Sequence, residues 1–207
     1  MAVVEFNIPK VAATELNQKH VHAYLAQDGY WMGVEITRDF HDPKRDPLLH
    51  SILEHITIDT AYIPTIQEQF GQARFYYLKR DYRKAAELYA TILERTGPGS
   101  SLNRDSWRFL VNQLGMSYGL NSEPVKTRDL LLWAIPNDPE YPLFHYILAC
   151  AYAEMDDPDS ALERLRLAYR YIANLRPGEI FPDPRKDPSF RKLRKDARFR
   201  AELDKLK

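Results

Sequence analysis

The sequence lacks the features of a disulfide-stapled, membrane-spanning or glycine-turned protein. Its 207 residues include one cysteine, Cys150, which excludes an intramolecular disulfide framework and a multi-thiolate zinc site. No window approaches the roughly 20 apolar residues that span a bilayer, and the N-terminus has no basic start followed by an apolar run. We therefore expect no membrane insertion and a cytoplasmic location, leaving open a signal peptide that was removed.

The sequence also has no excess of positive or negative charge. The 29 basic and 29 acidic residues cancel, so no overall field draws the chain to nucleic acid or to an anionic membrane. Only eight glycines stand against 13 tyrosines, nine phenylalanines and three tryptophans, which favours helices packed through aromatic side chains over a turn-rich β fold.

Helical periodicity begins at Ile63. Apolar residues from there to Tyr77 recur at helical spacing, with Pro64 in the first turn. Asp81 is then placed to cap a second helix that ends at Gly97. The spacing predicts a short-linked helical hairpin.

The same pattern returns twice. One copy runs from Asn112 to Pro136 with a turn at 121–124, and another has its turn at 156–158, where Asp157 is the expected N-cap and Pro158 the first helical residue. Three helical hairpins are therefore expected.

These residues resemble the tetratricopeptide-repeat (TPR) family, whose signature combines a Leu-Gly-x-x-Tyr element with a later small residue. Gly115 and Ala149 are 34 residues apart, the family period, whereas Ala73 and Gly115 are 42 apart, which implies an insertion after Gly97. The resemblance sets hairpins at about 66–99, 108–141 and 142–175. Departures are Gln72 for Leu, Thr127 for Ala and no closing Pro in the third copy. The matching residues are Ala73, Tyr76, Ala85, Tyr89, Leu114, Gly115, Tyr118, Leu131, Ala134, Leu148, Ala149, Tyr152, Ala161, Leu165 and Ala168.

Small residues in this pattern mark close helix crossings. Gly115 and Ala149 in first helices, and Ala85 and Ala161 in second helices, stand where a longer side chain would not fit. The prediction is that Ala161→Leu overpacks its crossing.

The chain ends flank this repeat region. Residues 175–207 read as a proline-rich connection followed by two short basic helices with an apolar face, which suits a terminal cap; a nucleic-acid-binding arm is the competing interpretation. Residues 130–200 resemble the end-of-group form of bacterial TPR proteins. Residues 1–62 are interpreted as a helical cap, with helices at 14–24 and from Asp46 to Ile58, and 3–6 as a strand or an extended arm. An unrelated small fold is the alternative there.

The resemblance implies a concave groove lined by the first helix of each hairpin. Its basic residues are too few for the carboxylate clamp by which some TPR proteins hold chaperone tails, so none is expected. The alternative is that the aromatic residues pack against the N-terminal segment. The candidate groove residues are Gln67, Phe70, Arg74, Tyr77, Phe109, Asn112, Met116, Leu143, Tyr146 and Cys150.

The sequence contains few features that indicate a catalytic site. Cys150 lacks a cationic neighbour on its helix face, as a nucleophile needs, and no phosphate loop or hydrolase elbow is present. We expect no catalytic residue, cofactor or metal. A metal-dependent enzyme built on the histidine-rich end is kept as an alternative, drawing on His20, His22, His41, His50, His55, Asp42, Asp46 and Glu54.

The sequence thus predicts an all-α, right-handed superhelix of about three TPR hairpins with helical caps at both ends. Its expected function is that of a non-catalytic scaffold that binds a peptide or protein segment in its groove. Self-association into a homo-oligomer through the same apolar surface or through the ends is the alternative.

Overall fold

The chain forms two compact units, residues 1–62 and residues 63–207. The computed structural model describes residues 2–11, 14–27, 30–56, 63–97 and 102–206. Among these residues, no helix combines the length and apolar content that a bilayer span requires.

The first unit is a small antiparallel sheet with one helix. The sheet has the strand order β1-β2-β3, so that each strand pairs with the next in the sequence. The prediction of a helical cap over 1–62, with a helix at 14–24, is therefore wrong, whereas the strand alternative for 3–6 is confirmed. The helix expected from Asp46 to Ile58 begins at Asp46 but ends at Glu54, and Ile58 lies outside the described residues. The elements are β1 (Ala2–Val11), β2 (Thr14–Gln27), β3 (Tyr30–Arg38) and α1 (Asp46–Glu54).

Side chains of β2 alternate between two environments, as a strand requires. Val21 and Ala23 are fully buried and pack with Leu49 and Leu53 of α1. The buried face also carries Lys19, whose Nζ lies 2.8 Å from a carboxylate oxygen of Glu5. Lys19 on the core face interrupts the alternation of polar and apolar residues that His20, Val21, His22 and Ala23 follow, so the strand pattern in the sequence is short.

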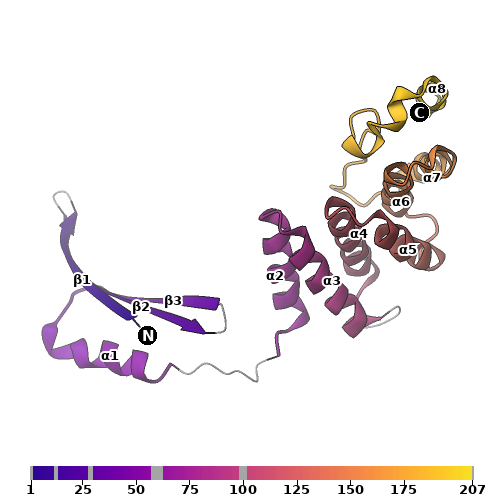
Figure 1. Ribbon diagram of the computed structural model, residues 1–207. Coiled ribbons are helices and arrows are strands. Elements are labelled where there is room, and N and C mark those ends of the chain that lie inside the picture. The colour runs from indigo at the N-terminus through magenta and orange to yellow at the C-terminus, as the bar shows by residue number, and fades with distance from the viewer. Residues whose placement is uncertain (1, 12–13, 28–29, 57–62, 98–101, 207) are drawn as a thin grey trace. The chain divides into compact units, whose positions relative to one another are not determined.

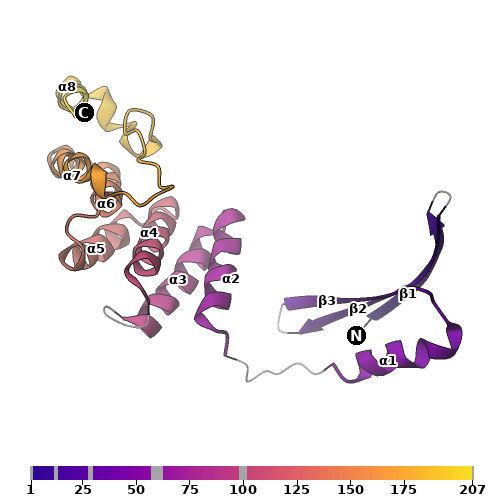
Figure 2. The same ribbon diagram turned by 180° about the vertical axis from the view of Figure 1, so that it is seen from behind.

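The second unit begins with three helical hairpins, in which each helix packs on the next (Figures 1 and 2). The mainly helical fold expected from the repeats is confirmed for this unit. The paired helices are α2 (Ile66–Leu78) with α3 (Tyr82–Thr96), α4 (Arg104–Leu120) with α5 (Pro124–Ala134), and α6 (Pro142–Glu154) with α7 (Pro158–Arg170).

The helix starts follow capping chemistry. Asp81 and Asp157 are N-caps as predicted, each accepting a hydrogen bond from a backbone N–H three residues ahead. Pro64 does not open α2, contrary to expectation. Thr65 caps that helix instead, in a reciprocal capping box with Glu68.

The three hairpin turns share one backbone geometry. The residue before each second helix's N-cap is left-handed, and the N–H of that N-cap donates across 2.9 Å to a tyrosine carbonyl of the preceding helix. This recurring bond identifies the hairpins as copies of one unit. The left-handed residues are Arg80, Ser122 and Asp156, with φ of +62°, +61° and +61°, and the tyrosines are Tyr76, Tyr118 and Tyr152.

Close helix crossings lie where the small residues predict them. Ala73, Ala149 and Ala161 are fully buried. A Cβ on Gly115 would lie 3.2 Å from Cδ2 of Leu131, which is tighter than ordinary packing. Thr127, which replaces the usual alanine, donates its hydroxyl to the Gly115 carbonyl across 3.1 Å.

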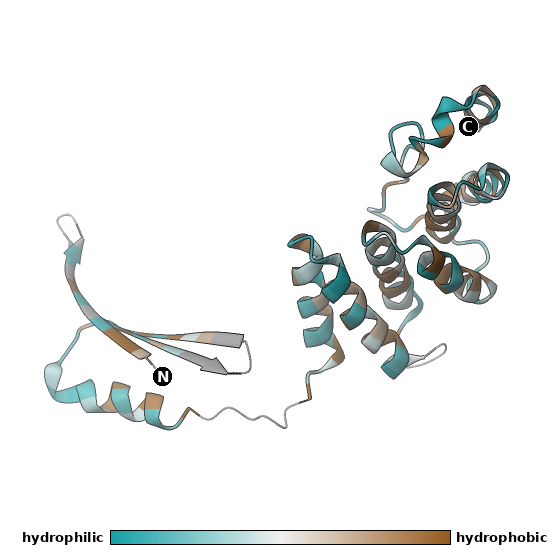
Figure 3. Cartoon of the chain, viewed as in Figure 1, coloured by the Kyte–Doolittle hydropathy of each residue, from teal (hydrophilic) through white to brown (hydrophobic). Residues whose placement is uncertain are grey.

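The C-terminal region covers the last hairpin. Its Phe190, Phe199 and Leu203 are buried in one apolar cluster with residues of α6 and α7. Figure 3 shows α6 as largely hydrophobic, in keeping with its burial between neighbours. Of the two short helices expected here, the first is only a 3-10 turn at Pro188–Phe190, and the second is α8 (Ala197–Asp204).

Candidate binding face of the helical repeats

The ten candidate groove residues lie on the first helices of the hairpins, and we call the surface that they define the first-helix face. Gln67, Phe70, Arg74 and Tyr77 belong to α2, Phe109, Asn112 and Met116 to α4, and Leu143, Tyr146 and Cys150 to α6. The structure divides this face into an accessible part on α2 and α4 and a covered part toward α6.

The accessible part is built on an aromatic contact between α2 and α4. The rings of Phe70 and Phe109 lie 6.1 Å apart, and both side chains are half-buried. Gln67 and Arg74 of α2 and Met116 of α4 are exposed on the same helices. An apolar floor with polar and cationic groups at its edge is typical of a protein-binding surface.

Burial raises the pKa of two tyrosines near this face, Tyr77 on α2 and Tyr89 in the core, where its ring lies 6.3 Å from that of Phe70. Burial raises the pKa of Tyr77, and the neighbouring Tyr82, whose ring is 5.5 Å away, adds to the effect. Burial also raises the pKa of Tyr89 to about 12, with a further rise from Tyr77 and an opposing effect of Arg74.

The covered part lies under the chain's own C-terminal segment. Tyr146 is 3% exposed, and its hydroxyl donates to Oδ2 of Asp187 across 2.8 Å. Its ring lies edge-on to Phe181, with centroids 5.3 Å apart. Sγ of Cys150 is 3.9 Å from the same Asp187 oxygen, and burial, followed by that carboxylate, raises the pKa of the thiol. Tyr146 and Cys150 are thus occupied by contacts within the chain and do not line an open groove.

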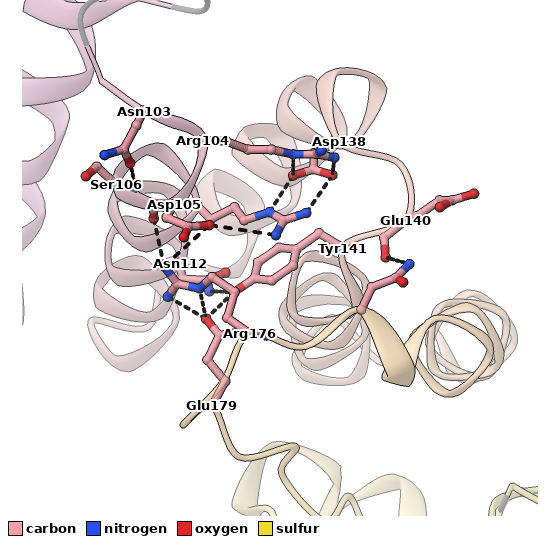
Figure 4. A network of polar contacts seen from close by, with 12 residues as sticks. Asn103, Arg104, Asp105, Ser106, Asn112, Asp138, Glu140, Tyr141, Arg176 and Glu179 are labelled. Atoms are coloured by element: carbon pink, nitrogen blue, oxygen red, sulfur yellow. Dashed lines mark hydrogen bonds and ion pairs between the residues drawn. The ribbon is translucent and has the colours of Figure 1, made fainter.

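A second set of contacts fixes this segment to α4 (Figure 4). Nδ2 of Asn112 donates to the Tyr141 hydroxyl across 3.0 Å, and that hydroxyl donates to Oε1 of Glu179 across 2.6 Å. Arg176 donates from Nε to Glu179 and from Nη1 to the backbone carbonyl of Asp105. Asn112 is therefore a buried structural residue rather than a polar handle for a partner.

The α5–α6 connection is held against α4 by a buried carboxylate. Asp138 is 1% exposed and accepts hydrogen bonds from both Arg104 and Arg108. Burial acts to raise the pKa of Asp138, but the hydrogen bonds from Arg108 and Arg104 outweigh it and leave the pKa below its ordinary value. The Arg108 guanidinium also lies 4.3 Å from the centre of the Tyr141 ring.

Sequence reasoning missed Asp138, Tyr141, Arg176 and Glu179 as determinants of this face. The partners that Asp138 and Tyr141 bond on other elements are 29 to 38 residues away along the chain. Arg176 donates to the Asp105 carbonyl, 71 residues away, so no local pattern marks these contacts. The only local sign is that Asp138 and Tyr141 stand in a short proline-flanked connection.

Two shallow hollows, of about 310 and 380 Å³, lie elsewhere in the second unit. Leu93 and Glu94 of α3 and Leu130 of α5 line both, and Trp133 lines the larger. These hollows are formed mainly by second helices and do not include the candidate groove residues.

Comparison with known proteins gives structural similarities only. No protein-family model matches the sequence, and no curated protein does. PcrH from Pseudomonas aeruginosa is similar in structure, with a TM-score of 0.48 and 12% identity over 72% of this chain and 98% of PcrH. The type III secretion translocator chaperone SycD from Yersinia enterocolitica is similar with a TM-score of 0.47 and 15% identity, over 72% of this chain and 96% of SycD.

Proposed function

We propose that this chain is a non-catalytic scaffold that binds an extended peptide segment of a partner protein on the α2–α4 part of the first-helix face. The observation that carries the proposal is that the α6 part already holds a segment without α-helix or strand, the chain's own turn-containing residues 176–190. Glu179 and Asp187 of that segment accept hydrogen bonds from Tyr141 and Tyr146. Because the α6 part of the repeat surface holds such a segment through tyrosine hydroxyls, we infer that the α2–α4 part can hold a segment of a partner protein.

The chemistry of the accessible part specifies the partner segment. Phe70 and Phe109 offer half-buried rings, and Met116, 39% exposed, offers an adaptable apolar surface next to them. Arg74 is exposed at the edge and is suited to a carboxylate. The proposed ligand is therefore an extended segment that combines apolar side chains with at least one acidic residue.

The thiol of Cys150 supports a non-catalytic role. Nucleophilic cysteines need a lowered pKa, which cationic neighbours provide. Burial and the Asp187 carboxylate raise the pKa of Cys150 instead. This favours a packed, neutral thiol.

The test is selection of peptides from a random displayed library with the full chain as bait, followed by affinity measurement with the selected peptides. The test variant carries Gln67→Ala, Arg74→Glu and Met116→Ser, all at exposed positions, so that the aromatic floor stays intact. The matched control carries Val125→Ala and Leu132→Ala, exposed positions of α5. We expect acidic–apolar peptides whose affinity falls at least about tenfold in the test variant and is unchanged in the control.

Equal affinity for both variants would overturn the proposed face. A mass that rises with protein concentration in the wild type, and that the test variant abolishes, would assign the same face to self-association instead. Circular dichroism of each variant establishes that it is folded.

A further inference from the structure

Two histidines and a glutamate gather on the sheet of the first unit. His20 and His22 are two residues apart in β2, so their side chains share one face of the sheet. In the register of β2 and β3, His20 is opposite Thr37 and His22 is opposite Glu35. Because α1 covers the face that carries Val21 and Ala23, this cluster lies on the other face.

The distances between the possible ligand atoms of the cluster are close to those found around a bound metal ion. Oε1 of Glu35 lies 3.5 Å from Nδ1 of His20 and 3.7 Å from Nε2 of His22. One ligand atom from each of the three residues can be chosen so that all lie within 4.8 Å of one another. Ligand atoms bound tetrahedrally at zinc distances are about 3.4 Å apart. Small side-chain rotations therefore suffice to close the set around an ion.

Exposure makes this adjustment feasible. The His20 and His22 side chains are 13% and 24% exposed, and the strands hold them in place. Glu35 is 58% exposed and free to rotate toward an ion. The Thr37 hydroxyl lies 3.1 Å from Nδ1 of His20 and 3.4 Å from Oε1 of Glu35, and it must turn away from these atoms when they bind the ion.

We propose that His20, His22 and Glu35 bind a divalent first-row transition ion, with Zn²⁺ as the expected occupant. Two imidazoles and one carboxylate suit Zn²⁺, and three protein ligands leave a fourth position for water. The site joins β2 to β3 and is independent of the first-helix face. It also departs from the expectation that the chain carries no metal.

The other histidines of this end do not join the site. Nε2 of His41 lies 2.7 Å from Oδ1 of Asp46, and Nε2 of His50 lies 3.0 Å from Oε1 of Glu5. Lys19 pairs with both Asp46 and Glu5, so His41 and His50 belong to one ion-pair network. Nδ1 of His55 lies 2.6 Å from the backbone carbonyl oxygen of Ser51. Of the broad histidine set considered from the sequence, His20 and His22 form the proposed site. Glu35, which that set omitted, is the third ligand.

The test uses the full chain, purified without a histidine tag and freed of metal, with Zn²⁺ as the probe. Binding is followed by competition with a chromophoric chelator and by the thermal midpoint. We expect one Zn²⁺ per chain and a rise in the midpoint with Zn²⁺. His22→Gln and Glu35→Gln should each weaken binding at least about tenfold. His50→Gln, whose side chain is 48% exposed and paired with Glu5, is the matched control and should bind like the wild type.

Absence of saturable binding of one ion, or unchanged affinity in both test variants, would overturn the site. Loss of binding in His50→Gln alone would move it to another histidine and would also overturn it. If His22→Gln fails to fold, the affinity of Glu35→Gln for Zn²⁺ tests the site. This variant should fold, because Glu35 is more exposed than His22 and glutamine has the same shape as glutamate.

Discussion

The Tyr141 hydroxyl donates a hydrogen bond to Glu179 across 2.6 Å, and so ties the residue before α6 to the segment that follows the last repeat. Burial acts to raise the pKa of Glu179, but hydrogen bonds from Arg176 and Tyr141 outweigh it and lower that pKa. The carboxylate therefore stays ionised and holds the C-terminal segment on the first-helix face.

Tyr141→Phe removes this tie while keeping the ring. Because Glu179 and Asn112 each lose a hydrogen-bond partner near the core, we expect the free energy of unfolding to fall by about 1–2 kcal/mol in urea titrations. Tyr76→Phe in α2 is the control for loss of a tyrosine hydroxyl. An undiminished free energy of unfolding would show that the Tyr141–Glu179 bond does not stabilise the fold.

Asp138 gives the fold an acid-sensitive contact. Hydrogen bonds from Arg108 and Arg104 keep its folded pKa below the unfolded value of 3.8. The resulting stabilisation is complete above pH 3.8 and is lost as the pH falls through the lower folded pKa. We therefore expect the unfolding free energy of the wild type to fall more steeply with acid than that of Asp138→Asn.

The same variant tests the buried pair at neutral pH. Asparagine leaves Arg108, whose side chain is 11% exposed, without its counter-charge, so we expect a loss of about 3 kcal/mol there. Asp129→Asn, at a carboxylate that is 60% exposed, is the control and should change little. If the unfolding free energies of Asp138→Asn and the wild type fell in parallel with acid, a lowered pKa of Asp138 would be contradicted.

Ala161→Leu tests the close crossing of α6 and α7. Ala161 is fully buried in the same apolar cluster as Ala149 and Leu165, so three added carbons have no space. We expect a loss of roughly 1–3 kcal/mol, seen as a lower thermal midpoint. Ala201→Leu, at an exposed position of α8, should leave the midpoint almost unchanged. Equal midpoints for Ala161→Leu and the wild type would place Ala161 away from the crossing.

The hairpins were predictable because their determinants are local. Asp81 and Asp157 cap helices through bonds from residues three positions ahead, and a small residue recurs at the equivalent position of each first helix. The sheet was not predictable in the same way. Lys19 occupies its buried face through ion pairs with Glu5 and Asp46, so polarity in β2 does not follow the usual alternation.

The candidate face was predicted in part. The resemblance to TPR proteins placed Phe70, Arg74 and Phe109 on the first helices of neighbouring hairpins, and the rings of Phe70 and Phe109 lie 6.1 Å apart. It gave no indication that Asp187 bonds to Tyr146, because 41 residues separate the two and a turn-rich segment intervenes. The contact of Glu35 with the histidines likewise depends on strand register, which a helical interpretation of β2 could not supply.

The three left-handed turn residues have a consequence for the molecule's electrostatics. Arg80, Ser122 and Asp156 are exposed and occupy equivalent backbone positions, yet one is cationic, one neutral and one anionic. The turn geometry therefore places no demand on charge at this position. A change of charge at Arg80 or Ser122 would therefore alter the electrostatic field at the turns without repacking the helices. The charge of Asp156 has a second role, because it pairs with Lys192 of the C-terminal region.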